Sequence, residues 1–293
     1  MRLLNASGCL DALTAPDTAR ALDVFVTKTV TPLPRGGNAP VRIAETDVGM
    51  LNSIGLANPG REAFLGQTLT RLAGCGVPVW VSVGGFSARE YAETCAALDE
   101  RDEVAVVELN LSCPNVDEAP ETAAELVSAA RAATRKPLYA KLSPANWDIA
   151  QGAKAVEAAG ADGLSLVNTM RGLALDERTL APRLATATGG LSGPALKPIA
   201  LAAVYACRGA TQLPIVGMGG VMNGRDVLEF VACGANDVAL GTVLFADPEA
   251  PARVRDELAA ELSAHGFVSV DDAFACAHDD HSPVRVSREL SPM

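Results

Sequence analysis

The chain has 293 residues, 49% hydrophobic and only 4% aromatic, with a formal net charge of −11 and a pI of about 4.8. This acidic balance argues against a nucleic-acid backbone as the main partner, and no apolar run approaches the ~20 residues that cross a bilayer. The seven cysteines include no C-x-x-C pair, which argues against disulfides or zinc and favours reduced thiols in the cytoplasm. The first residues lack the charged and apolar regions of a signal peptide.

Short apolar runs alternate along the chain with Ala-rich segments of helical periodicity. Eight runs predict strands at Leu3–Ala6, Val24–Thr27, Pro78–Val83, Val104–Leu109, Leu138–Leu142, Gly163–Val167, Leu213–Met218 and Asp237–Leu240. Helices are predicted at 61–73, 88–99, 121–134, 147–159, 195–208, 224–233 and 249–263. This order favours an α/β fold of the (β/α)8 TIM-barrel type over an open sheet. One barrel of roughly 250 residues uses nearly all of the chain, so a single domain over 1–293 is expected, although length alone also allows two smaller domains.

Two segments break the alternation, and one tail follows it. Residues 29–60 are rich in Gly, Pro and Asn, and residues 170–194 form a second long insert. We expect both to be loops at the carboxyl ends of strands, which is the catalytic face of a barrel. The tail over about 268–293 is mixed and polar, and no role is assigned to it.

Glycine-rich turns follow the last two predicted strands. They are GMGG at 217–220 and GT at 241–242. Glycine lets a backbone approach a phosphate closely, and the loops after the seventh and eighth strands of barrels commonly bind one. Plain turn glycines are the alternative, but the placement after both strands favours a phosphate, such as that of FMN.

Polar residues appear abruptly in ELNLSCPN (108–115), where the fourth strand ends. Cys113 precedes a proline and therefore lies in a turn. A cysteine there can act as a general base if its pKa is tuned, whereas a buried structural cysteine is the more common role. The neighbouring Asn110, Ser112 and Asn115 favour the catalytic role. All three histidines lie in the last 30 residues, so no histidine base is expected at a strand end.

Two lysines and several asparagines also stand at strand ends or in the long inserts. Lys28 and Lys141 each follow an apolar strand, and burying an ammonium is costly unless it neutralises an anion. Asparagine offers both a donor and an acceptor, which suits the reading of an imide or amide ring, although it is also an ordinary turn residue. The set comprises Asn52, Asn110, Asn115 and Asn168.

At this point the sequence resembles the dihydroorotate dehydrogenase family, and most of all the catalytic subunit of its NAD-linked class 1B form. The matching segments run in family order from residue 5 to about residue 250. They are NASGC (5–9), AETDVGMLNSIGLANPG (44–60), ELNLSCPNV (108–116), PLYAKLSP (137–144), AVEAAGADGLSLVNT (155–169), GGLSGPALKP (189–198), GMGGV (217–221) and GTVLFADP (241–248).

The resemblance implies FMN-dependent oxidation of (S)-dihydroorotate to orotate in de novo pyrimidine (UMP) synthesis. Cys113 would take the proton from C5, while C6 delivers hydride to FMN. The resemblance assigns substrate binding to Lys28, Asn52, Gly55, Leu56, Asn110, Asn115, Asn168 and Thr169. It assigns FMN binding to Ala6, Ser7, Lys28, Thr29, Asn110, Lys141, Gly193, Gly219, Gly220, Gly241 and Thr242, and no metal site is expected.

The resemblance also implies a homodimer and a second subunit that carries FAD and an iron–sulfur cluster on the way to NAD. The sequence departs from the family in several places. The family's leading strand pair, which closes the barrel base, is missing before NASGC, and the loop after Cys113 is short. Ser82 stands where an asparagine usually touches flavin, Arg171 lies near the substrate end, and residues 11–14 replace a Phe/Gly-rich stretch.

Three other functions compete with dihydroorotate oxidation. The chain could act on another dihydropyrimidine, a reading that Arg171 and the short loop motivate. It could be a non-catalytic barrel subunit, against which Cys113 and the two lysines argue. A flavin barrel that reduces uridine in tRNA conflicts with the acidic charge.

Overall fold

The computed structural model describes residues 1–111 and 122–278. Eight parallel strands form one sheet in the order β1-β12-β11-β8-β7-β6-β5-β2. They are β1 (Leu3–Asn5), β2 (Phe25–Val26), β5 (Val79–Val83), β6 (Val104–Asn110), β7 (Leu138–Leu142), β8 (Gly163–Leu166), β11 (Ile215–Met218) and β12 (Asp237–Leu240). All eight predicted strands are confirmed to within two residues at each end, and so is the barrel.

The sheet closes between its two shortest strands, β1 and β2. One parallel bridge joins Leu4 to Val24. Beside it, the fully buried Asn5 side chain donates from Nδ2 to the carbonyl of Val26 and accepts at Oδ1 from the Val26 N–H, both at 2.8 Å. A side-chain amide thus makes the pair of bonds that a longer strand would make with its backbone.

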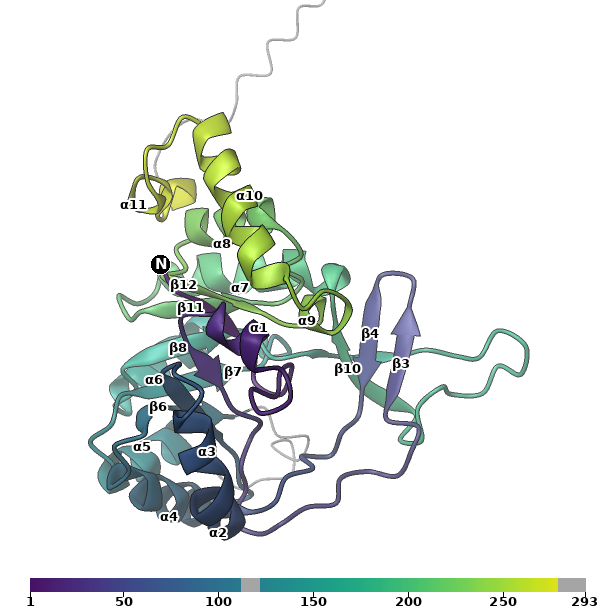
Figure 1. The fold of residues 1–293 in the computed structure, drawn as a ribbon, viewed down its shortest axis with the longest axis vertical. Coiled ribbons are helices and arrows are strands. Elements are labelled where there is room, and N and C mark those ends of the chain that lie inside the picture. Colours follow the sequence, from purple (N-terminus) through teal and green to yellow (C-terminus); the bar gives the residue numbers. More distant parts are fainter. Residues whose placement is uncertain (112–121, 279–293) are drawn as a thin grey trace, which may run out of the picture.

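Helices surround the barrel (Figure 1). They are α1 (Pro16–Arg20), α2 (Arg61–Ala63), η1 (Phe64–Thr68), α3 (Leu69–Ala73), α4 (Ala88–Asp99), α5 (Ala123–Ala133), α6 (Ile149–Ala158), η2 (Pro194–Leu196), α7 (Lys197–Arg208), α8 (Gly224–Ala232), α9 (Val243–Ala246), α10 (Ala250–Ala264), α11 (Val270–Ala273) and η3 (Cys276–His278). Ser87 caps α4 and Asn223 caps α8, because their side chains accept from the N–H groups of Glu90 and Asp226. In the described part of the chain, no helix is long and apolar enough to cross a membrane.

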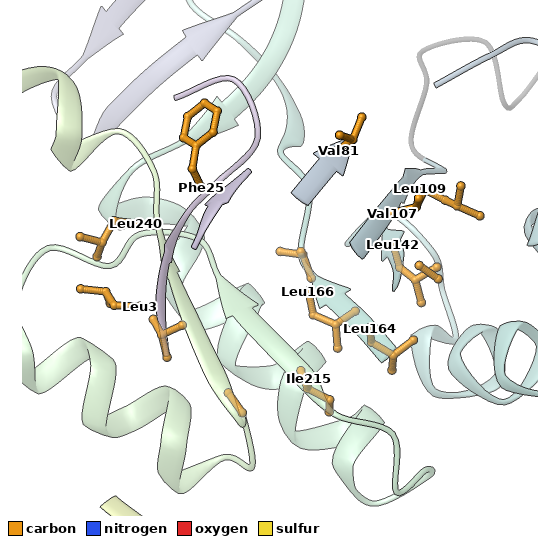
Figure 2. Close-up of a cluster of buried hydrophobic side chains, with 14 of the residues drawn as sticks. Leu3, Phe25, Val81, Val107, Leu109, Leu142, Leu164, Leu166, Ile215 and Leu240 are labelled. Carbon is orange, nitrogen blue, oxygen red and sulfur yellow. The ribbon is translucent and has the colours of Figure 1, made fainter. Parts of the chain in front are cut away.

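The strands bury both of their faces. Side chains that point outward pack against the helices, and Figure 2 labels members of this cluster from all eight strands. The alternate side chains form a second cluster: Leu4, Val24, Val26, Trp80, Val106, Tyr139, Val216, Met218 and Ala239. Within it the rings of Trp80 and Tyr139 lie 4.7 Å apart, and the Arg2 guanidinium lies 5.3 Å from the Trp80 ring. This alternation places every second strand residue in the barrel interior.

The two long inserts contain strands, so the expectation of loops was incomplete. β3 (Ile43–Thr46) and β4 (Gly49–Asn52) come from the first insert, and β9 (Met170–Leu173) and β10 (Thr188–Ser192) from the second. They form an antiparallel sheet in the order β3-β4-β10-β9, which stands to one side of the barrel in Figure 1. Each insert follows the carboxyl end of a barrel strand, so this second sheet stands at the barrel mouth.

Candidate functional site

A chain of hydrogen bonds joins polar side chains at the carboxyl ends of neighbouring barrel strands. Asn110, which ends β6, donates from Nδ2 to the hydroxyl of Thr29 after β2 (3.2 Å). That hydroxyl lies 3.1 Å from the buried hydroxyl of Ser82 in β5 and 3.4 Å from that of Ser7 after β1. Residues predicted to bind FMN from three separate segments are therefore brought together, with Ser82 supporting Thr29.

The predicted substrate-binding asparagines continue this chain toward the second sheet. Asn168, after β8, donates to the Asn110 Oδ1 (3.1 Å) and accepts from the Thr169 N–H (2.8 Å). Asn52 in β4 donates to the Gly190 carbonyl in β10 (3.3 Å). A Cβ built on Gly190 would lie only 2.1 Å from the Thr169 hydroxyl. Asn52, Thr169, Asn168 and Asn110 therefore line one continuous region where the second sheet meets the barrel.

The segment between β4 and α2 is held in one shape. Gly55 and Leu56 both have positive φ, 72° and 56°, and Gly55 packs closely against Asn38. Asn58 fixes the segment, because it accepts from the N–H groups of Thr31 and Gly60 and donates to the Leu56 carbonyl. Asn58 was not predicted as a site residue, and its only signal in the sequence is its position in the long family segment 44–60.

Both predicted lysines reach the same region. Lys141 in β7 is 5% exposed, and its Nζ lies 3.6 Å from Oε1 of the buried Glu108. Lys28 packs over Gly8, where a built Cβ would lie 3.2 Å from the Lys28 Nζ. Burial raises the pKa of the Cys9 thiol, and the charges of Lys141 and Lys28 oppose that shift. Lys28 thus lies beside the Gly8–Cys9 turn, and the charge of Lys141 acts on the same thiol.

The predicted glycines meet at the ends of β11 and β12. Gly220 has a φ of 76°, and a Cβ built on it would lie 2.8 Å from the Gly193 carbonyl, so the two turns pack directly together. A Cβ built on Gly241 would lie in ordinary contact with Ala6 (3.9 Å) and Cys9 (4.0 Å), so these two turns also lie close together. Within the described residues, the backbone N–H groups of Gly220 and Thr242 make no hydrogen bond. Such N–H groups are suited to an anion.

The remaining predicted residues are placed as follows. Cys113 and Asn115 lie outside the described residues. Arg171 lies on β9, exposed, with its backbone opposite Gly190 of β10. Asp11 accepts from the Leu13 N–H in a turn that leads into α1. No group of three or more metal-ligating His, Cys, Asp or Glu side chains occurs among residues 1–111 and 122–278.

Comparison with known proteins settles the family. The family model described as "Dihydroorotate dehydrogenase" matches residues 2–262. This chain belongs to the dihydroorotate dehydrogenase family. The resemblance predicted from the motifs is thus confirmed, and members of this family are flavin-dependent enzymes.

Curated dihydroorotate dehydrogenases are similar to the chain over most of its length. The proteins of Halalkalibacterium halodurans and of Listeria monocytogenes strain EGD-e are each 43% identical over 258 residues, 86% of this chain and 85% of the relative. The protein of Pelobacter propionicus is 44% identical over the same share. All three are named "Dihydroorotate dehydrogenase B (NAD(+)), catalytic subunit".

A solved dihydroorotate dehydrogenase has the same fold. The crystal structure of DHODH from Eimeria tenella in complex with ferulenol superposes with a TM-score of 0.78 at 21% identity, over 94% of this chain and 85% of that one. At this identity the likeness supports the barrel architecture, which the strand order shows independently.

Proposed function

We propose that the chain is a dihydroorotate dehydrogenase that oxidises (S)-dihydroorotate to orotate in de novo pyrimidine synthesis, with FMN as its cofactor. The observation that supports this most is the continuous set of donors at the barrel mouth. It runs from Ser7 and Thr29 through Asn110 to Asn168, with two lysines beside it. A planar, anionic substrate and a planar, anionic cofactor both require such a surface.

The described residues fit FMN at both of its ends. The N–H groups of Gly220 and Thr242, which make no hydrogen bond to any described residue, suit the phosphate, and Gly193 and Gly219 shape the turns. The flavin ring would lie against Ala6, Ser7, Thr29, Asn110 and Lys141, with Lys28 nearby. When bound, FMN supplies the hydride acceptor.

The chain's own residues would bind the substrate and move its proton. Asn52, Asn110, Asn115, Asn168 and Thr169 would hydrogen-bond the ring, and Lys28 would neutralise the carboxylate. Gly55 and Leu56, held by Asn58, would shape one wall. Cys113 would take the proton from C5 of dihydroorotate as the general base.

We also propose the assembly and location of the chain. The relatives' names mark them as catalytic subunits of an NAD-linked enzyme. By analogy, the chain would form a homodimer and pass electrons to a second subunit with FAD and an iron–sulfur cluster. Residues 1–293 would form one cytoplasmic domain, with no role assigned to the tail from about residue 268.

The deciding experiment is an anaerobic titration of the purified protein, in which the flavin absorbance is followed while dihydroorotate is added. Bleaching of one flavin per chain, reversed by excess orotate, is the expected result. A flavin that dithionite bleaches but dihydroorotate does not would contradict the substrate and favour another dihydropyrimidine. A protein that takes up no FMN would favour a non-catalytic barrel.

A further inference from the structure

A buried carboxylate lies inside the barrel below the proposed flavin site. Glu108 is the fifth residue of β6 and is 1% exposed. Its side chain shares the inward face of β6 with Val106 and Asn110, because alternate residues of a strand point the same way. Across the sheet, Asn110 is in register with Lys141, whereas Glu108 is in register with Tyr139. Glu108 therefore lies one layer deeper in the barrel than Lys141.

The two carboxylate oxygens of Glu108 have different surroundings. Oε2 accepts a hydrogen bond from the buried Ser165 hydroxyl in β8 (2.9 Å). Oε1 faces the Lys141 ammonium at 3.6 Å and has no hydrogen-bond partner among the described residues. Ser165 thus fixes the carboxylate from one side and leaves the other oxygen for Lys141.

Stability alone does not account for this pair. Burying two charges costs about as much as their attraction returns, and apolar side chains of similar volume are often as stable. The cluster on the inward face of the strands is otherwise largely apolar, with Trp80, Val106 and Met218 among its members. The ion pair instead fixes the position of the Lys141 ammonium, which is the end of the pair nearer the barrel mouth.

We propose that Glu108 is a positioning residue that holds the Lys141 side chain charged and directed at the flavin, with Ser165 orienting the carboxylate. This inference rests on the proposed function, because it assigns a partner to a lysine of the proposed FMN site. Among residues 1–111 and 122–278, the charged or titratable groups that act on this region are Glu108 from below, Cys9 after β1, and Lys28 after β2. Of these, Glu108 alone forms an ion pair with Lys141 in the described part of the chain.

The test is the midpoint potential of bound FMN as a function of pH in wild type and Glu108→Gln. The variant leaves the Lys141 charge unbalanced, and a net positive charge beside a flavin favours its reduced form. We therefore expect a positive shift of the potential at about pH 6. A buried ammonium without its carboxylate loses its proton at lower pH, so the shift should vanish by about pH 10 through an inflection that wild type lacks.

Two further variants control for structural damage. Glu103→Gln removes an ion-paired carboxylate from the residue just before β6, where Glu103 binds Arg101 at 2.7 Å, and should leave the potential unchanged. The double variant Glu108→Gln with Lys141→Met removes both charges and should fold without the extra inflection. Curves for Glu108→Gln that superpose on wild type throughout would overturn the proposal.

A second readout does not need flavin. The Lys141 signal in NMR spectra of lysine-labelled protein, assigned by its loss in Lys141→Met, should titrate at lower pH in Glu108→Gln than in wild type. An unchanged titration would overturn the role of Glu108. If the wild type takes up no FMN while this titration shifts as expected, the proposed function fails and the Glu108–Lys141 coupling stands.

Discussion

Cys113 is the residue on which the proposed proton transfer depends most. Replacing it with serine removes a base that can ionise near neutral pH, so Cys113→Ser should slow flavin reduction by dihydroorotate by about 10²–10⁴-fold. FMN content should not change, because Cys113 is not among the proposed FMN contacts. Stopped-flow absorbance measures the rate. Cys75→Ser is the matched control, since the Cys75 thiol contacts the carbonyls of Ala12 and Arg71 away from the site. Equal rates of flavin reduction in wild type, Cys113→Ser and Cys75→Ser would show that Cys113 is not the base.

Residues of the candidate site differ in how visible they are in the sequence. Asn110, Asn168 and Lys28 stand out because polar side chains appear where an apolar strand stops, and the structure brings them to one mouth. Glu108 went unnoticed inside the run VAVVELNL, where a carboxylate between apolar residues looks incidental. Glu108 and Asn110 are two residues apart in one strand, so both side chains must point into the barrel if one does. This spacing was the available signal for Glu108.

At the scale of elements, the β1–β2 closure depends on Asn5. Asn5→Ala leaves the N–H and the carbonyl of Val26 without their buried partners, and each such loss costs about 1–3 kcal/mol. We expect the free energy of unfolding to fall by about 2–5 kcal/mol in urea denaturation, with faster amide exchange in β1 and β2. Asn146→Ala, at an exposed position after β7, is the control. A change in Asn5→Ala as small as in that control would show that the amide does not hold the closure.

The elements also show where sequence patterns stop being informative. The barrel strands were predictable because they are apolar runs buried on both faces. β3, β4, β9 and β10 were not, since they are short, contain glycine and polar residues, and pair with partners from another insert. Such pairing is set by register across the sheet, as between Asn52 and Gly190, and no local pattern encodes it.

For the whole molecule, one acidic contact predicts how stability depends on pH. Hydrogen bonds from the Arg135 N–H and the Thr134 hydroxyl lower the pKa of Asp99 to about 2. A carboxyl whose pKa is lower in the folded than in the unfolded protein stabilises the fold at any pH above its unfolded-state pKa of about 3.9. This contribution to stability is lost as the pH falls through the folded-state pKa. The stability difference between wild type and Asp99→Asn should therefore be constant above about pH 5 and shrink below it.

Urea unfolding between about pH 3 and about pH 7 measures this difference. Asp102→Asn is the matched control, because Asp102 makes no hydrogen bond within the described residues. The stability difference between this variant and wild type should not shrink at low pH. A gap that stays constant down to about pH 3 would contradict the assignment to Asp99.

Side chains fill the base of the barrel. Trp80 and Tyr139 fill the lower interior, and Arg2 lies over the Trp80 ring while bonding Asp237 at 2.6 Å. The base is thus packed with the chain's own first residues and two aromatic rings. Although aromatic residues make up only 4% of the chain, Trp80 and Tyr139 are both buried here.

The division of the second sheet between two inserts determines when it can form. Asn52 and its partner Gly190 are 138 residues apart, so during synthesis β4 leaves the ribosome long before β10 exists. Until then the β3–β4 hairpin presents an open strand edge, the kind of surface on which nascent chains aggregate. The wall beside the proposed substrate site is therefore assembled late, and a nascent chain stalled before residue 188 carries that edge uncovered.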